Sequence, residues 1–222
     1  MNMNARENIL NKIRNAQLRT KAESNEISDS PDTVKHYLHS HPRGPQPTIP
    51  DDLIANFKHR AIKLSSDVLE TSDIQRVPAL ITQYLSERQL PNQGICWPTL
   101  AELPWSAAGL NIESRPANSL DGVGITGAFC AIAETGTLMM LSGTETPAAT
   151  SLLPETHIAV LDPQRIVATM EDAWELMRKE YKQPPRAVNF ISGPSRTADI
   201  EMTVTMGAHG PYRVLVILAP AQ

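Results

Sequence analysis

The sequence predicts an α/β protein in which helices cover both faces of a mainly parallel sheet, a three-layer α/β/α sandwich. Helical periodicity alternates along the chain with short apolar runs of strand length. These runs are continuously apolar rather than alternating, which is typical of strands buried on both faces. The chain has 222 residues, enough for one such domain with an additional N-terminal segment.

Residues 1–50 are expected to form a separate N-terminal region. Apolar residues at helical spacing predict an amphipathic helix over residues 4–18, and we expect homo-oligomer formation through this helix or the arm that follows it. Residues 20–50 are polar and then rich in proline, which predicts an extended arm. No nearby cysteine or carboxylate completes a recognisable ligand spacing, so we predict no metal site from the three histidines of this arm, His36, His39 and His41.

Residues 51–222 carry the alternating pattern and are expected to form the α/β domain. Helices are predicted to begin at Asp51 and at Ile74. Asp162-Pro163 predicts a third helix, running to Tyr181, because Asp caps free amides and Pro fits a first helical turn. Strands are predicted at 67–70, 94–98, 112–115, 123–126, 128–133, 138–141, 157–161, 187–191 and 212–218.

Composition and charge exclude several classes of function. The formal net charge is −4 and no strongly basic patch occurs, so nucleic acid is not an expected partner. No apolar run is long enough to span a bilayer and the N-terminus lacks a signal-peptide pattern, so we expect a cytoplasmic protein. Cys96 and Cys130 lie in apolar strands and are interpreted as reduced packing residues. Two cysteines cannot supply four ligands to an iron–sulfur cluster, so we expect this chain to bind no cofactor of that kind.

The stretch GITGAFCAIAETGTL, residues 124–138, is the first candidate site. It places a Glu-Thr-Gly-Thr turn between two buried strands. Glu134 is the candidate catalytic residue, since a carboxylate at a strand end can act as a base or a nucleophile, or bind a ligand. The alternative is a buried glutamate whose carboxylate accepts hydrogen bonds from neighbouring backbone amides. The hydroxyls and backbone amides of the turn predict anion or substrate binding by Thr135, Gly136 and Thr137.

A second candidate site follows the strand at 187–191. The sequence Ser-Gly-Pro-Ser before a predicted helix start is typical of anion binding at the carboxyl end of a parallel sheet. Arg196 is expected to bind a carboxylate or phosphate through its guanidinium fork. The alternative is an arginine paired with Asp199 or Glu201 to fix the loop. The predicted binding residues are Ser192, Gly193, Ser195 and Arg196.

Two further histidines are candidates for chemistry. His209 lies between glycine-containing turns and is a candidate acid–base group or ligand contact, although a lone histidine is more often structural. His157 opens a predicted strand and is a weaker candidate. The chain contains no GxGxxG dinucleotide motif, no P-loop and no GxSxG elbow, which argues against ordinary nicotinamide, ATP and hydrolase chemistry.

Three stretches, GITGAFCAIAETGTLMMLS, SLLPETHIAVLDPQRIV and ISGPSRTADIEMTVTMGAHGPYRVLVIL, together resemble the LUD-domain family. The resemblance covers nearly the whole chain. It implies a fold like that of the NagB/RpiA/CoA-transferase group. It also implies a role in a cytosolic system that oxidises L-lactate to pyruvate and supports growth on lactate. In that system the iron–sulfur clusters belong to partner proteins, and this chain resembles the subunit without them.

The resemblance brings no catalytic mechanism, so two functional hypotheses stay open. In the first, the chain is a component of the lactate-oxidising assembly that binds a small carboxylate, another anion or a partner subunit. In the second, it is an independent transferase or isomerase acting on a CoA ester or a phosphorylated sugar through Glu134. CoA transferases of this fold group use a glutamate in a comparable turn, but the sequence AETG is not their motif, and fold kinship alone does not assign a reaction.

Overall fold

The computed structural model describes residues 6–7, 9–15, 31–41, 43–198, 204–207 and 209–220. The chain divides into two units, Met1–Gln46 and Pro47–Gln222, and each is described by itself.

In the first unit, residues 9–15 are helical, and the rest of the helix expected over 4–18 lies largely outside the described residues. A second helix, α2 (Pro31–Ser40), lies within the segment that was expected to be extended, so that prediction was wrong here. Its ends explain the helix: proline occupies the first position, Asp32 the first turn and His39 the last turn. The proline-rich residues 43–50 have no regular secondary structure.

The second unit is built on a six-stranded sheet whose pairs are all parallel. Its central strands β7 and β12 are buried along almost their whole length and are mostly apolar, because both faces of the sheet are covered. In spatial order the strands are β1 (Asp67–Glu70), β12 (Arg213–Leu218), β7 (Thr156–Leu161), β4 (Val123–Gly127), β2 (Gln93–Cys96) and β3 (Asn111–Ser114).

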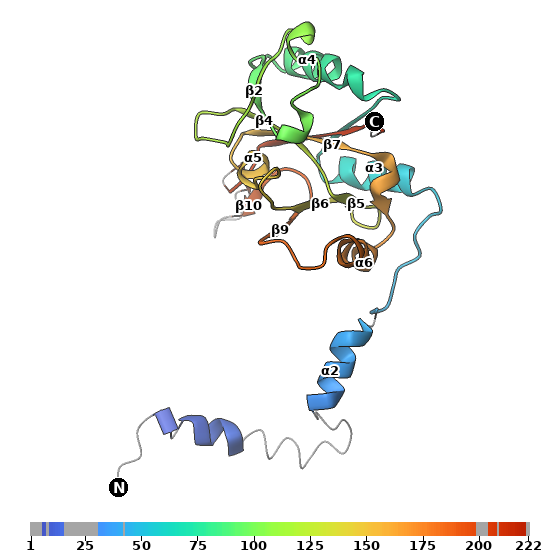
Figure 1. The fold of residues 1–222 in the computed structure, drawn as a ribbon, viewed down its shortest axis with the longest axis vertical. Helices are drawn as coiled ribbons and strands as arrows, with labels where there is room; N and C mark the ends of the chain where they lie inside the picture. Colours follow the sequence, from blue (N-terminus) through green and yellow to red (C-terminus); the bar gives the residue numbers. More distant parts are fainter. Residues whose placement is uncertain are drawn as a thin grey trace. The chain divides into compact units, whose positions relative to one another are not determined.

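Helix α4 (Val77–Glu87) packs on one face of this sheet, where its Ile81 and Leu85 meet Ile125 of β4 and Leu215 of β12. Helix α3 (Leu53–Lys63) packs on the other face through Phe57. Figure 1 shows α4 on one side of β2, β4 and β7, and the remaining layers on the opposite side. The three-layer α/β fold with a mainly parallel sheet is therefore confirmed. Among the described residues, no helix is both long and apolar enough to cross a membrane.

A four-stranded mixed sheet, which the sequence did not predict, shares the face covered by α3. One side of it packs toward the parallel sheet, and α6 (Met170–Glu180) covers its other side through Ala173 and Met177 (Figure 1). A short helix, α5 (Ala149–Leu152), contacts β4 and β7. The strands are β8 (Ile166–Val167), β5 (Cys130–Ile132), β6 (Thr137–Leu141) and β9 (Val188–Ile191), in that order.

Two predicted helix starts were wrong. Asp162-Pro163 begins only a single 3₁₀ turn, η4 (Pro163–Arg165), because Ile166 then pairs with β5 as a strand. Helix α6 starts at Met170, where the side chain of Thr169 forms a capping box with Asp172. The Ser-Gly-Pro-Ser sequence leads into an antiparallel ribbon, β10 (Arg196–Ala198) with β11 (Val204–Met206), and not into a helix.

Candidate functional site

The Glu-Thr-Gly-Thr turn, residues 134–137, joins β5 to β6 and lies against α3. Gly136 has φ +70°, and a Cβ there would lie 2.5 Å from the backbone nitrogen of Ala61. On the approach to the turn, Asn56 of α3 donates a hydrogen bond from Nδ2 to the carbonyl of Ala133 at 2.8 Å. Only glycine allows both the left-handed backbone and this close approach to the helix. The glycine is therefore required to seat the turn on α3.

Glu134 is half-buried, and its backbone N–H donates to the carbonyl of Ala168 at 3.0 Å. Within the described part of the chain, its carboxylate makes no hydrogen bond and no ion pair. The alternative of a glutamate held by backbone amides is therefore not observed there.

The second candidate loop, residues 192–196, lies against the C-terminal end of the same helix. Gly193 has φ +83°, and a Cβ there would lie 2.2 Å from the carbonyl oxygen of Leu64, which follows α3 directly. The guanidinium of Arg196 donates through Nη2 to the hydroxyl of Ser65. Asp199 and Glu201, the alternative partners of Arg196, lie outside the described residues.

Hydroxyl groups connect the two loops. Thr135 donates from Oγ1 to Thr137 Oγ1 at 2.8 Å, and Thr137 Oγ1 lies 2.7 Å from Ser192 Oγ. Two segments more than fifty residues apart therefore meet over α3 through a chain of three hydroxyls. Figure 1 shows their strands β6 and β9 side by side, in agreement with their antiparallel pairing.

Ser195 and His209 extend this loop cluster toward the start of β12. The backbone N–H of Ser195 donates to the carbonyl of Pro211 at 2.9 Å. The N–H of His209 lies 3.4 Å from Ser195 Oγ, and the His209 side chain is exposed. The contact places His209 beside the loop but gives no hydrogen-bonding partner to its ring.

The location of this cluster corrects the expected anion site. Pro211 comes just before β12, and the end of α3 comes just before β1, so the loops lie at the amino end of the parallel sheet. The strand β9 that leads into the loop belongs to the mixed sheet. The sequence predicted a helix N-terminus at the carboxyl end of a parallel strand, and that prediction is therefore wrong. The residues do converge, but any anion would have to be bound by side chains and loop amides.

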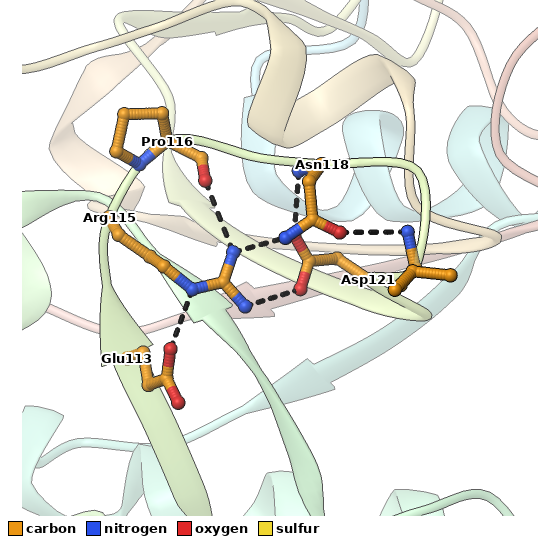
Figure 2. A network of polar contacts seen from close by, with 6 residues as sticks. Glu113, Arg115, Pro116, Asn118 and Asp121 are labelled. Carbon is orange, nitrogen blue, oxygen red and sulfur yellow. Dashed lines mark hydrogen bonds and ion pairs between the residues drawn. The ribbon is translucent and has the colours of Figure 1, made fainter.

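A separate polar network closes the loop between β3 and β4 (Figure 2). Arg115 donates from Nε to Glu113 at 2.6 Å and from both terminal nitrogens to Asp121, at 2.7 and 2.8 Å. Hydrogen bonding to Arg115 lowers the pKa of the Asp121 carboxyl. The same guanidinium reaches the carbonyl of Pro116, while Asn118 donates its N–H to Asp121. Because the donors of Arg115 are engaged, this network is interpreted as structural.

His157 is fully buried in β7, and its Nε2 lies 2.8 Å from the hydroxyl of Thr126. Burial lowers the pKa of this histidine to about 4, so it is neutral near pH 7 and packs as a core residue. Both cysteines are free and buried. Burial raises the pKa of the Cys96 thiol to about 11 and that of the Cys130 thiol to about 12, as expected for packing residues.

The described side chains of the N-terminal histidines, His36, His39 and His41, are exposed. No three residues of metal-binding type gather anywhere in the described part of the chain.

A hollow of about 270 Å³ was missed by the sequence reasoning. It lies where β2 and β4 end, and its lining includes Trp97, Gly127, Phe129 and Tyr181. The signal available in the sequence was an aromatic residue or a glycine directly after a buried strand. The walls of the hollow come from segments far apart in the chain, and hydrophobic periodicity carries no information about which segments meet.

The sequence and the fold of this chain are similar to those of known proteins. A LUD domain matches residues 111–219. Lactate utilization protein C of an Exiguobacterium species is 32% identical over 179 residues, covering 76% of this chain and 78% of the relative. The protein of the same name from Bacillus subtilis is 29% identical over 188 residues, with the same coverage of 76% and 78%. The crystal structure of a DUF162 family protein from Deinococcus radiodurans aligns with a TM-score of 0.59 at 21% identity, covering 78% of this chain and 99% of that one.

The fold and the loop cluster define an α/β protein with a parallel sheet and a shared loop site over one helix. The Deinococcus structure supports the fold alone, because its identity to this chain is low. The chain belongs to the LUD-domain family, and over about three quarters of its length it is similar to lactate utilization protein C.

Proposed function

We propose that this chain is a component, without iron–sulfur clusters of its own, of a cytoplasmic system that oxidises L-lactate to pyruvate and supports growth on lactate. The observation that carries the proposal is the similarity to lactate utilization protein C across most of both chains, at 29% and 32% identity. In this proposal the chain acts with iron–sulfur partner proteins that carry the electrons.

The chemistry of the two thiols supports a subunit without clusters. Cluster ligands are thiolates, and burial makes each thiol here harder to ionise than an ordinary cysteine. Cys96 lies in the parallel sheet and Cys130 in the mixed sheet, with their side chains in different core clusters. Neither cysteine is placed to begin a four-thiolate site.

The loop cluster over α3 is the proposed contact for a small carboxylate or for a partner subunit. Arg196 is exposed, and within the described residues its guanidinium uses a single nitrogen, in the hydrogen bond to Ser65; the proposal assigns its other N–H donors to a carboxylate. The hydroxyl chain ending at Ser192 adds polar groups beside it. The half-buried Glu134 supplies a carboxylate on the same surface, suited to a cationic group of a partner. No observed contact of Glu134 favours the transferase or isomerase alternative, which stays a prediction from the sequence.

Copurification tests the assembly. The tagged chain would be isolated from cells growing on L-lactate, and the eluate assayed for iron, acid-labile sulfide and protein identity. We expect iron–sulfur proteins to elute with the wild type and in at least about fivefold lower amount with Arg196→Ala. Arg178→Ala is the matched control, because Arg178 is an exposed arginine on α6 outside the loop cluster.

Elution of the wild-type chain alone after cross-linking, together with no heat of binding for L-lactate or pyruvate in calorimetry, would contradict the proposal. If the amount of copurified iron–sulfur protein fell equally with both arginine variants, the loop cluster would not be the contact, but the assembly itself would still be supported.

Self-association is a further part of the proposal. Three apolar side chains lie exposed at helical spacing on α2, those of Val34, Tyr37 and Leu38. An exposed apolar stripe of this kind is suited to a second copy or a partner helix. A monomer by light scattering across the working concentration range would exclude the homo-oligomer.

A further inference from the structure

The hollow at the ends of β2 and β4 lies at the carboxyl edge of the parallel sheet, opposite the loop cluster over α3. Trp97 follows the last residue of β2, and Gly127 is the last residue of β4. Phe129 comes two residues after that glycine, and Tyr181 follows α6. Ser142 and Gly143 complete the lining from the loop after β6.

This position is the point at which the sheet changes its direction of winding. The connection that leaves β2 packs Leu100 and Trp105 on the α4 face of the sheet. The connection that leaves β4 forms the mixed sheet and packs Leu138 on the α3 face. Since β2 and β4 are neighbours, their connections diverge to opposite faces and leave a crevice between the two strand ends. In open α/β sheets, ligands bind at such switch points.

Three aromatic side chains line the crevice together with small and polar residues, and no charged side chain lines it. The guanidinium of Arg165 lies 4.6 Å from the centroid of the Phe129 ring, where it is paired with Glu180. The Phe129 and Tyr181 rings pack edge to face with their centroids 5.8 Å apart. Trp97 is held in place by a hydrogen bond from Nε1 to the carbonyl of Pro147 at 3.1 Å. The side-chain hydroxyls of Thr99 and Tyr181 make no hydrogen bond to another described residue, so they can pair with a ligand. The site therefore offers flat apolar surfaces with a few polar groups, the usual composition of a small-molecule pocket.

We propose that this crevice binds an uncharged compound with one or two fused planar rings. The rings of the ligand pack against the side chains of Trp97, Phe129 and Tyr181, and a hydroxyl or carbonyl substituent meets the hydroxyls of Thr99 and Tyr181. A charged ligand loses its hydration there without gaining a counter-ion, since no charged side chain lines the crevice. The volume of about 270 Å³ lies just below the usual range for drug-sized ligands, which suits a bicyclic ring. The site is thus distinct in chemistry from any carboxylate contact at the loop cluster.

The test uses two probes with the same ring system and different charge. Near pH 7, 2-naphthol is neutral and 2-naphthoate is an anion. Binding of each to the full-length chain is measured by equilibrium dialysis. We expect 2-naphthol to bind at least about tenfold more tightly than 2-naphthoate, because only the anion carries an uncompensated charge into the crevice.

A glycine substitution locates the binding. A Cβ at Gly127 would meet the Trp97 ring at 3.8 Å, an ordinary contact, and Gly127 lines the crevice, so we expect Gly127→Val to fold and its methyl groups to narrow the crevice. Gly122→Val is the matched control at the other end of β4, where a Cβ meets nothing within 4 Å. We expect Gly127→Val to weaken 2-naphthol binding at least about tenfold and Gly122→Val to leave it unchanged, with both variants folded by circular dichroism.

Three outcomes would overturn the proposal: no binding of 2-naphthol by the wild type, equal binding of the two probes, or an affinity for 2-naphthol that Gly127→Val leaves unchanged in a folded protein. None of these outcomes bears on growth with lactate or on copurification, so this proposal and the proposed function can fail separately.

Discussion

Protonation of His157 should weaken the fold in mildly acidic solution. Its ordinary pKa of 6.5 applies in the unfolded chain, and burial lowers the value to about 4 in the folded protein. Above pH 6.5 both states are neutral at this position and stability does not depend on it. As the pH falls from 6.5 to about 4, His157 binds a proton in the unfolded chain but not in the folded protein. At about 1.36 kcal/mol per pH unit, the free energy of unfolding falls by about 3 kcal/mol across that window.

The comparison with His157→Gln isolates this effect. Glutamine can keep a hydrogen bond to the hydroxyl of Thr126 and does not titrate. Glutamine has no atom that corresponds to Nδ1 of His157, and that nitrogen is buried without a hydrogen-bonding partner in the described structure. Urea unfolding followed by tryptophan fluorescence, at intervals between pH 7.5 and 4.5, gives the free energy of unfolding of each protein. The stability advantage of the wild type over the variant should shrink steadily below pH 6.5. Parallel pH profiles for the two proteins would refute the assignment of His157 as a buried neutral group.

Three further results are expected. Gly136→Ala should lower the free energy of unfolding by at least about 2 kcal/mol because its Cβ would strike the backbone of α3, whereas Gly109→Ala, at φ +77° with open space around it, should cost only about 1 kcal/mol in urea unfolding. A double-mutant cycle of Thr137→Val and Ser192→Ala should give a coupling energy of about 0.5–1.5 kcal/mol by the same assay, and strict additivity would mean that the two loops are not joined in solution. The two buried thiols should react with a thiol reagent only as fast as the protein unfolds, and rapid labelling of the native chain would contradict their burial.

The parallel sheet could be predicted because each of its strands is recognisable from its own residues. β12 is apolar at every buried position and β7 at four of six, and each is bounded by turn or cap residues. The mixed sheet could not be predicted, since the pairing of β6 with β9 joins segments about fifty residues apart and periodicity carries no information about partners. For the same reason Ile166 was assigned to a helix, although pairing with β5 makes it a strand residue.

The sequence singled out the two candidate loops but did not predict where they lie or that they meet. The Glu-Thr-Gly-Thr and Ser-Gly-Pro-Ser sequences do meet, and Gly136 and Gly193 are glycines because α3 leaves no room for a Cβ. An antiparallel ribbon that begins at Arg196 lies where the sequence predicted a helix, so the expected helix N-terminus is absent there. The aromatic crevice at the other edge of the sheet was missed because its walls come from four separate segments.

Growth on L-lactate tests the proposed function most directly. A strain lacking the gene would be supplied with the wild type, Glu134→Gln, or Glu102→Gln as an exposed control, and grown on L-lactate or on pyruvate as sole carbon source. The account predicts that the deletion strain fails on L-lactate and grows on pyruvate, and that the wild type and Glu102→Gln restore growth. Failure of a folded, abundant Glu134→Gln would place the turn over α3 in the working site. Normal growth of the deletion strain on L-lactate, with no second lactate oxidase present, would contradict a role in lactate utilisation.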